Sequence, residues 1–174
     1  MTETLRTRTV VWEDPQAVID ASSQLSGIDL LRAIARGEIP PPPMAMLVGL
    51  TPVLAEEGRV IFALTPAEVH YNTMGVVHGG AIATLVDTAL GCAVMSKMPL
   101  GTGYTTVELH LNFVRPVTAA TGRILCEALI LHSGSRMATA EAKVRDEAGK
   151  LYAHATTTCF VFRSPSQPSS TKTG

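Results

Sequence analysis

Charged residues are scarce in this chain, and their two signs almost cancel. Lys and Arg number 14 and Asp and Glu 15, which gives a formal charge of −1 and a charged share of 17%, against about 25% in typical soluble domains. Because there is no basic excess, we expect neither a nucleic acid nor a membrane surface as a partner. Soluble chains with so few charges often bury surface in an oligomer, and we expect one here.

Cysteines and histidines are too few and too scattered to indicate a disulfide framework or a metal site. The three cysteines, Cys92, Cys126 and Cys159, form no Cys-x-x-Cys pair, and such an odd, widely spaced set favours reduced thiols. None of the five histidines pairs at the i, i+4 spacing of a helical metal site, so no metal is expected. The first residues lack the apolar segment of a secretory signal, and we expect a cytoplasmic protein.

Several familiar catalytic motifs are missing as well. The sequence contains no Gly-x-Ser-x-Gly elbow, which removes the nucleophile of that class of Ser-His-Asp hydrolases. It contains neither a P-loop nor a Gly-x-Gly-x-x-Gly turn, the usual signatures of nucleotide and dinucleotide binding. We therefore expect no cofactor.

What the chain does have is one long apolar segment of helical character, residues 79–97. It contains no proline, and apolar side chains occupy nearly every angle around the predicted helix, which is typical of a helix buried in a core. At roughly 20 residues it is long enough to span a bilayer. However, Asp87 stands at its centre and its flanks lack anchoring charges or aromatic residues. We predict a core helix.

Two features of this helix are unusual, the Gly79-Gly80 pair at its start and the carboxylate of Asp87 inside it. The first N–H groups of a helix have no intrahelical partner, and glycines there let a carbonyl oxygen approach them closely. No basic residue lies one turn from Asp87, and isolated carboxylates cluster at functional sites. The plainer alternatives are close packing of the glycines and chance placement of Asp87 on a solvated face.

The rest of the chain predicts antiparallel strands, because apolar and β-branched runs are joined by short links. The expected strands are residues 50–55, 59–64, 105–114, 122–131, 137–146 and 151–162. Strict alternation in residues 105–114 places one set of side chains on one face, namely Val107, Leu109, Leu111 and Phe113. It places Thr106, Glu108, His110 and Asn112 on the other face.

Three parts of the chain are expected to differ in organisation. Residues 1–43 form an N-terminal extension, in which Ser26 and Asp29 resemble a capping box before a short helix at about residues 28–36. Residues 44–162 form the main domain, which begins with one or two helical turns. Residues 163–174 are rich in Ser, Pro and Thr and are expected to be disordered.

A family resemblance rests on Asn72, His78-Gly79-Gly80, Asp87, Thr105-Thr106-Val107-Glu108-Leu109 and Phe113-Val114-Arg115-Pro116. Together these residues resemble the hotdog-fold acyl-CoA thioesterases, most closely the phenylacetate-pathway type, over about residues 45–162. The resemblance implies an α+β hotdog fold, with a curved antiparallel sheet of about six strands wrapped around the long helix. It also implies an acyl-CoA substrate and a homodimer or a dimer of dimers.

The resemblance implies roles for individual residues. The Gly79 N–H and the Asn72 amide polarise the thioester carbonyl, while Asp87 acts as a general base on water or as a nucleophile. Thr106 holds the water, and His78 holds the loop. Gly80 and Met74 are expected to contact the substrate. Ser133 and Arg136 are expected to contact the nucleotide phosphates of CoA; the alternative is that they belong to an ordinary hairpin turn.

The spacing of Gly79 and Asp87 predicts a site built by two chains. The two residues are 87 − 79 = 8 positions apart, which is about 12 Å along a helix. A short Asp side chain cannot act across that gap on a carbonyl held at Gly79. A twofold axis crossing two antiparallel helices near Ala83 brings Gly79 of one chain beside Asp87 of the other.

Two other functions remain open from the sequence. One is a hotdog hydratase or dehydratase of acyl thioesters, and the other is a non-catalytic acyl-CoA-binding module. The acyl group itself is not determined by the sequence. We expect the wall of its pocket to come from residues 44–50, Tyr71, Met74 and the far end of the helix.

Overall fold

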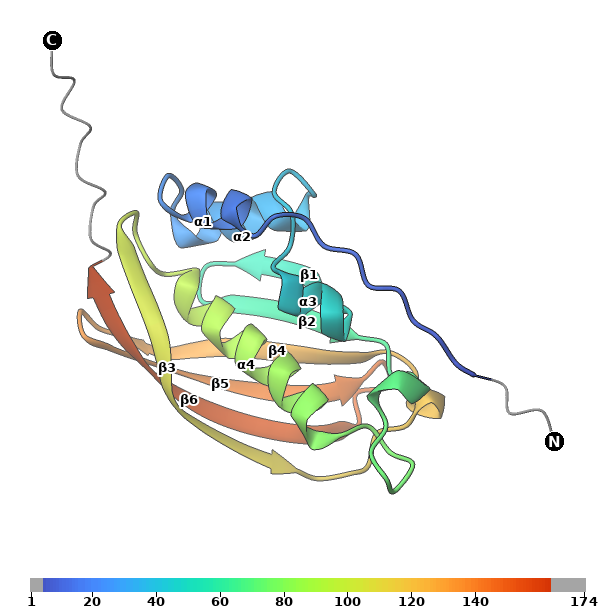
Figure 1. Ribbon diagram of the computed structural model, residues 1–174. Coiled ribbons are helices and arrows are strands. Elements are labelled where there is room, and N and C mark those ends of the chain that lie inside the picture. Colours follow the sequence, from blue (N-terminus) through green and yellow to red (C-terminus); the bar gives the residue numbers. More distant parts are fainter. Residues whose placement is uncertain (1–4, 164–174) are drawn as a thin grey trace, which may run out of the picture.

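The computed structural model describes residues 5–163, and in it one long helix lies in the curve of a six-stranded antiparallel sheet (Figure 1). The helix is α4 (Gly79–Met95). The strands are β1 (Leu50–Glu56), β2 (Arg59–Leu64), β3 (Thr102–Phe113), β4 (Ile124–Ser133), β5 (Met137–Asp146) and β6 (Leu151–Arg163), in the spatial order β1-β2-β4-β5-β6-β3. The predicted hotdog architecture is confirmed. Residues 164–174 of the predicted disordered tail lie outside the described residues.

Helix α4 is buried on one side only, which differs from the expectation of a helix apolar all round and fully enclosed. The buried side carries larger residues at helical spacing and packs on the sheet. It consists of Ile82, Leu85, Val86, Ala89, Leu90, Ala93 and Val94, and Gly91 is buried as well, against Tyr104. The opposite side carries Gly80, Ala83, Thr84, Asp87 and Thr88, and none of these is buried. The sheet curves around one side of the helix, and small residues mark the side that it leaves open.

Strand β3 departs from the predicted alternation because it contains a bulge between Thr106 and Glu108. In antiparallel pairs, directly opposite residues point to the same face of the sheet. Thr106 pairs with Cys159 and Leu109 pairs with Thr157, and both β6 residues are buried on the helix side. The extra residue at Val107 therefore turns Thr106 to the face of Leu109. The prediction that placed Thr106 with Glu108 on the opposite face was wrong.

The N-terminal extension contains two helices, α1 (Gln16–Ser22) and α2 (Gly27–Ala35), and is followed by α3 (Pro43–Val48). The Ser26 cap is confirmed, because its hydroxyl accepts the Asp29 N–H. Helix α1 was not predicted, and it has no buried residue that would impose a period. Gly27 lies directly on the end of α4: its N–H donates to the Met98 carbonyl, and a Cβ there would lie 1.9 Å from the Met95 carbonyl oxygen. Only glycine permits this contact.

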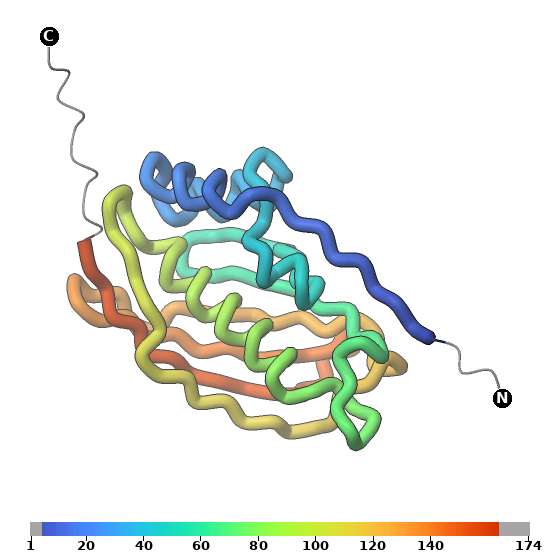
Figure 2. The backbone as a smooth tube through the Cα atoms, viewed as in Figure 1, coloured from blue at the N-terminus to red at the C-terminus, as the bar shows by residue number. Residues whose placement is uncertain are grey.

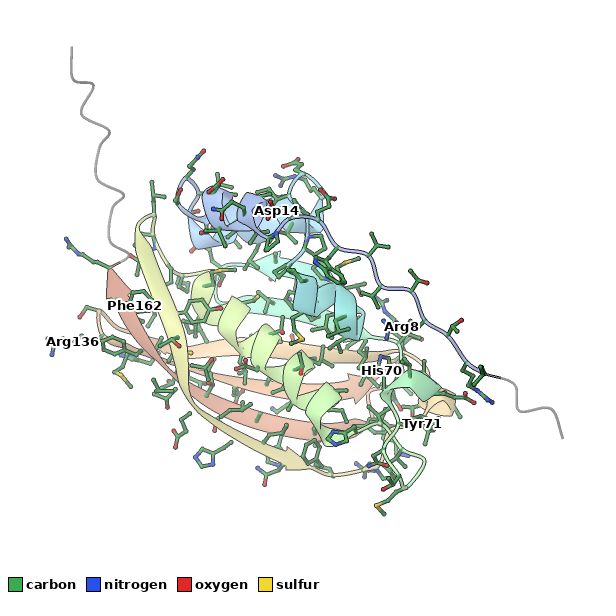
Figure 3. All side chains as sticks on the ribbon, in the orientation of Figure 1. Arg8, Asp14, His70, Tyr71, Arg136 and Phe162 are labelled. Atoms are coloured by element: carbon green, nitrogen blue, oxygen red, sulfur yellow. The ribbon has the colours of Figure 1, made fainter. Side chains whose placement is uncertain are left out.

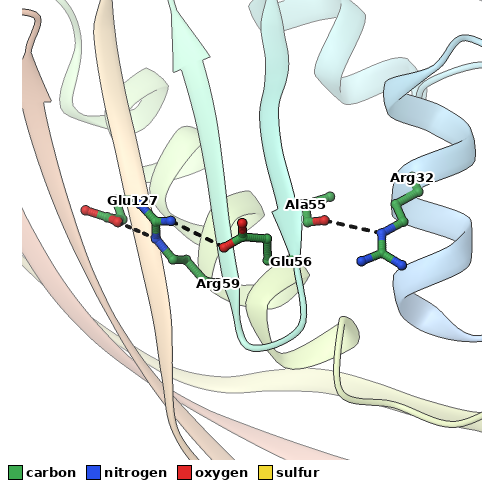
Figure 4. A network of polar contacts seen from close by, with 5 residues as sticks. All are labelled: Arg32, Ala55, Glu56, Arg59 and Glu127. Atoms are coloured by element: carbon green, nitrogen blue, oxygen red, sulfur yellow. Dashed lines mark hydrogen bonds and ion pairs between the residues drawn. The ribbon is translucent and has the colours of Figure 1, made fainter.

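The extension is also tied to the sheet and to the loop before α4. Arg32 in α2 donates to the Ala55 carbonyl of β1 at 3.4 Å, and Arg59 links neighbouring strands through Glu56 and Glu127 (Figure 4). The arm of residues 5–14 runs as an extended segment past α3 (Figure 2). It reaches the short 3₁₀ turn η1 (Glu68–His70), which precedes α4. A second 3₁₀ turn, η2 (Ala119–Thr121), follows β3. Among the described residues, no helix is long and apolar enough to cross a membrane.

Candidate active site

The start of α4 is capped by a side chain two residues upstream of Gly80. His78 is the N-cap residue, and its Nδ1 accepts the Gly80 N–H at 2.8 Å. The carbonyl of His78 accepts from Ala81 at 2.9 Å. Within residues 5–163, no hydrogen bond from the Gly79 N–H is found. The donor open to a ligand is therefore the Gly79 N–H, at the positive end of the helix dipole, whereas the Gly80 N–H is taken by His78.

Both glycines also pack closely, as the plainer interpretation of the pair expects. A Cβ on Gly79 would lie 3.1 Å from Cζ of Phe113, and one on Gly80 would lie 2.9 Å from Nδ1 of His78. Gly79 is partly exposed and Gly80 is exposed. Gly79 and Gly80 therefore both pack closely against neighbouring side chains and leave their backbone accessible.

Asn72 opens the turn that leads into α4, and its side chain has one end tied down. Its Oδ1 accepts the Met74 N–H at 2.9 Å, and its backbone N–H donates to the Val76 carbonyl at 2.8 Å. The Nδ2 donors make no hydrogen bond within the part of the chain that the structure describes. Asn72 therefore presents donors, as the carbonyl-polarising role requires. Met74 lies in this turn and is 83% exposed, so in the single chain its side chain is open to solvent.

Asp87 and Thr106 meet on the open side of α4. Thr106 Oγ1 donates to Asp87 Oδ1 at 3.1 Å. The expectation that Asp87 is enclosed in the core was wrong for the single chain, because the residue is exposed. Behind it, burial and the nearby Asp87 charge raise the pKa of the Cys92 thiol to about 12. Cys92 is therefore held as a neutral thiol, which does not favour a role as a nucleophile.

The Gly79 N–H, which is expected to donate to the thioester carbonyl, and the Asp87 carboxylate lie on different turns of one continuous helix. Because α4 runs unbroken over Gly79–Met95, the spacing of Gly79 and Asp87 stays at about 12 Å. The structure thus brings Asn72, His78 and Gly79 together at the helix start and, separately, Asp87 and Thr106 at its middle. Within one chain the two groups of candidate residues therefore lie apart.

Comparison with known proteins identifies the family. The thioesterase superfamily matches residues 74–153. Human acyl-coenzyme A thioesterase 13 is 30% identical over 105 residues, which cover 60% of this chain and 74% of that protein. The chain belongs to the thioesterase superfamily. The enzyme class predicted from the sequence, thioester hydrolase, is confirmed.

Two further similar proteins indicate which type of thioesterase the chain resembles. A Halobacterium salinarum protein that carries an esterase name is 39% identical over 72 residues, which span 40% of this chain and 46% of that protein. The solved phenylacetic acid degradation-related protein of Ralstonia eutropha JMP134 is 26% identical, with a TM-score of 0.68 over 75% of this chain and 98% of that chain. The resemblance to the phenylacetate-pathway type is confirmed.

Ser133 and Arg136 lie far from the α4 start of the same chain. They flank the β4–β5 turn, where the Arg136 carbonyl accepts the Val161 N–H. Both side chains are exposed. Figure 3 shows Arg136 at the end of the molecule opposite His70 and Tyr71, which lie near the start of α4. Within one thioesterase chain, Arg136 and Gly79 therefore do not share a site.

A groove of ≈ 540 Å³ runs beside the start of α4. Leu47, Val48 and Tyr71 line it, and all three are among the residues that the sequence suggested for an acyl-pocket wall. Arg8 and His70 also line the groove, and the sequence did not indicate either of them. The His70 Nε2 lies 3.0 Å from the Val48 carbonyl oxygen and 3.5 Å from an Arg8 nitrogen. No local pattern could have indicated these contacts, because the partners come from segments far apart in the chain.

Over residues 5–163, no cluster of three or more His, Cys, Asp or Glu side chains that could hold a metal ion is found.

Proposed function

We propose that this thioesterase hydrolyses an acyl-CoA thioester to a free acid and CoA, at a site that two subunits share. One observation carries the proposal: the Asp87–Thr106 pair and the Gly79 N–H lie on one continuous helix, two turns apart. The name of human acyl-coenzyme A thioesterase 13 supports acyl-CoA as the substrate class. A homodimer is the smallest assembly that completes the site, and a dimer of dimers would preserve it.

Two unpartnered surfaces of the chain support this assembly. The open side of α4 is one, and β3 is the other, because β3 is an edge strand of the described sheet. Exposed edges readily pair with a second strand. A twofold axis that runs two α4 helices antiparallel beside each other brings Gly79 of one subunit to Asp87 of its partner. It also carries the Arg136 end of the partner toward that Gly79, where an Arg can meet nucleotide phosphates.

The chemistry follows from this placement. The Gly79 N–H and the Asn72 amide donate to the thioester oxygen, and donors of this kind stabilise the oxyanion by about 10²–10³-fold each. The partner's Asp87 takes a proton from water that attacks the carbonyl carbon, or attacks it directly to give a mixed anhydride that water then opens. The C–S bond breaks, and the CoA thiolate leaves and is protonated. Thr106 orients the carboxylate and its water, and His78 holds the donor loop.

Mixed dimers test the shared site. Asn72→Ala and Asp87→Asn homodimers should each be nearly inactive, whereas refolding the two variants together in equal amounts should restore roughly a quarter of wild-type activity. Half of the dimers are then mixed, and each mixed dimer has one intact site and one site with both lesions. Thiol release from acyl-CoA is the measurement, with subunit mixing verified by native mass spectrometry. No recovery above the parent variants excludes a shared site.

A matched control uses the same two lesions in another arrangement. Chains that carry both substitutions are refolded in equal amounts with wild-type chains. A shared site gives roughly a quarter of wild-type activity, because every site of a mixed dimer receives one lesion. A site built within one chain gives roughly a half. The same assay distinguishes hydrolysis from hydration of an acyl thioester, because only hydrolysis releases thiol.

A further inference from the structure

A second groove, of ≈ 680 Å³, lies at the end of α4 remote from Gly79. Its walls come from the α1–α2 extension, the last turn of α4, and the loop that starts β3. Figure 1 shows the two extension helices over this end of α4. The apolar side chains that line it are Ile19, Leu25, Leu30, Met95 and Leu100. The mechanism above makes no use of this groove.

Tyr104 connects the groove to the catalytic carboxylate. It lines the groove, and its hydroxyl lies 2.8 Å from where a Cβ on Gly91 would be. Gly91 is one helical turn beyond Asp87, and Met95 is one turn further, on the same side of the helix. The Tyr104 ring thus packs against Gly91, between Asp87 and the groove. Its hydroxyl has no hydrogen-bond partner among the described residues.

Charge distinguishes this groove from the one at the start of α4. Its lining contains no Lys, Arg or His, and its one charged residue is the acid Asp20. The other groove is lined by Arg8, His70 and His78. The phosphates of CoA are anionic and suit the second set, whereas a groove with apolar walls and an acid at its rim suits an uncharged hydrocarbon chain.

We propose that the groove formed by the α1–α2 extension receives the distal end of an apolar acyl chain, which reaches it past Tyr104. The inference rests on the proposed function, since it takes Asp87 as the group that acts on the thioester. The extension lies outside residues 74–153 that match the family, so this chain carries its own determinant of acyl length. Each methylene that becomes buried there favours binding by about fourfold.

Two substitutions in the groove test this. Leu100 and Ile19 are 57% and 55% exposed, so a change to Glu leaves the fold in place and puts a charge where the chain should lie. For Leu100→Glu and for Ile19→Glu, the ratio of kcat/KM for dodecanoyl-CoA to that for butanoyl-CoA should fall by about tenfold or more. Val69→Glu is the matched control, because Val69 is 56% exposed and lines the other groove. It should leave the ratio unchanged.

The outcomes separate this inference from the proposed function. The assignment of the groove is overturned if the dodecanoyl-to-butanoyl ratio of kcat/KM stays unchanged in both groove variants, or if it falls in Val69→Glu. Thiol release by the wild type upholds the proposed function in either case. If the wild type releases no thiol from any acyl-CoA, the function fails. Calorimetric binding of dodecyl-CoA and butyl-CoA thioethers then tests whether the groove binds the alkyl chain. A loss of the preference for dodecyl in Leu100→Glu supports the groove, and equal affinities in the wild type overturn it.

Discussion

The two sides of α4 differ in burial and in the side chains that they carry. On the side that faces the sheet, Leu85, Val86 and Leu90 are all 0% exposed, and each contributes about 1.5–3 kcal/mol through burial. On the other side, Asp87 is exposed and meets Thr106. The buried side fixes the position of the helix on the sheet. The burial that holds the helix in place therefore comes from residues other than Asp87.

The sharpest test of this division is Asp87→Asn, which keeps the shape of the side chain and removes its basicity. We expect kcat/KM to fall by about 10³-fold or more, with a change in unfolding free energy within about 0.5 kcal/mol. Thiol release and urea unfolding measure the two quantities. A variant that retains most of its turnover would show that Asp87 only holds Thr106 in place.

The converse change is Leu85→Ala on the buried side. It should lower the free energy of unfolding by about 3 kcal/mol, because a fully buried leucine leaves a cavity, while turnover per folded molecule stays within a few-fold of the wild type. Thr88→Ala, on the open side, serves as the stability control and should change the urea midpoint little. If Leu85→Ala reduced turnover as much as Asp87→Asn, the two sides would not be separable.

A smaller effect is expected from Thr106→Val, which removes the hydroxyl that donates to Asp87. Hydrogen bonds to charged groups contribute about 1.5–3 kcal/mol, so kcat/KM should fall by about tenfold or more. Thr105→Val is the matched control, because Thr105 is exposed and pairs with the exposed Phe160 on the outer face of the sheet. Equal losses in the two variants would contradict the placement that the bulge gives to Thr106.

A further effect concerns the exclusion of water from the buried side, and it appears only at alkaline pH. Burial raises the pKa of the Cys126 thiol from its ordinary 9.0 to about 12. The folded protein holds this proton more tightly than the unfolded chain, so the stabilisation is fully present below about pH 9 and is lost as the pH rises toward 12. Each pH unit in this window costs about 1.4 kcal/mol per such thiol.

Cys126→Ala measures this contribution. Urea unfolding of the variant and the wild type should give curves of stability against pH that run parallel below about pH 9 and then converge. The variant declines less steeply, because it has one buried thiol fewer to ionise on unfolding. Curves that stay parallel into the alkaline range would show that water reaches Cys126.

Local signals in the sequence predicted much of the fold. The Ser26 cap, the turn at residues 56–58 that joins β1 and β2, and the start of α4 at Gly79 all lie where the pattern placed them. Each depends on a few neighbouring residues, whose propensities and hydrogen bonds act within one turn. Helix α1 escaped prediction because it buries no side chain and so has no hydrophobic period.

The sequence by itself determined that Gly79 and Asp87 stand about 12 Å apart, since the rise of a helix depends only on its own hydrogen bonds. The tertiary structure decided which side of that helix stays open, and on which face of β3 Thr106 lies. The bulge that places Thr106 forms only when β3 pairs with β6, some 50 residues further along the chain. Such pairings are selected by how distant segments pack around one core, so no local pattern records them.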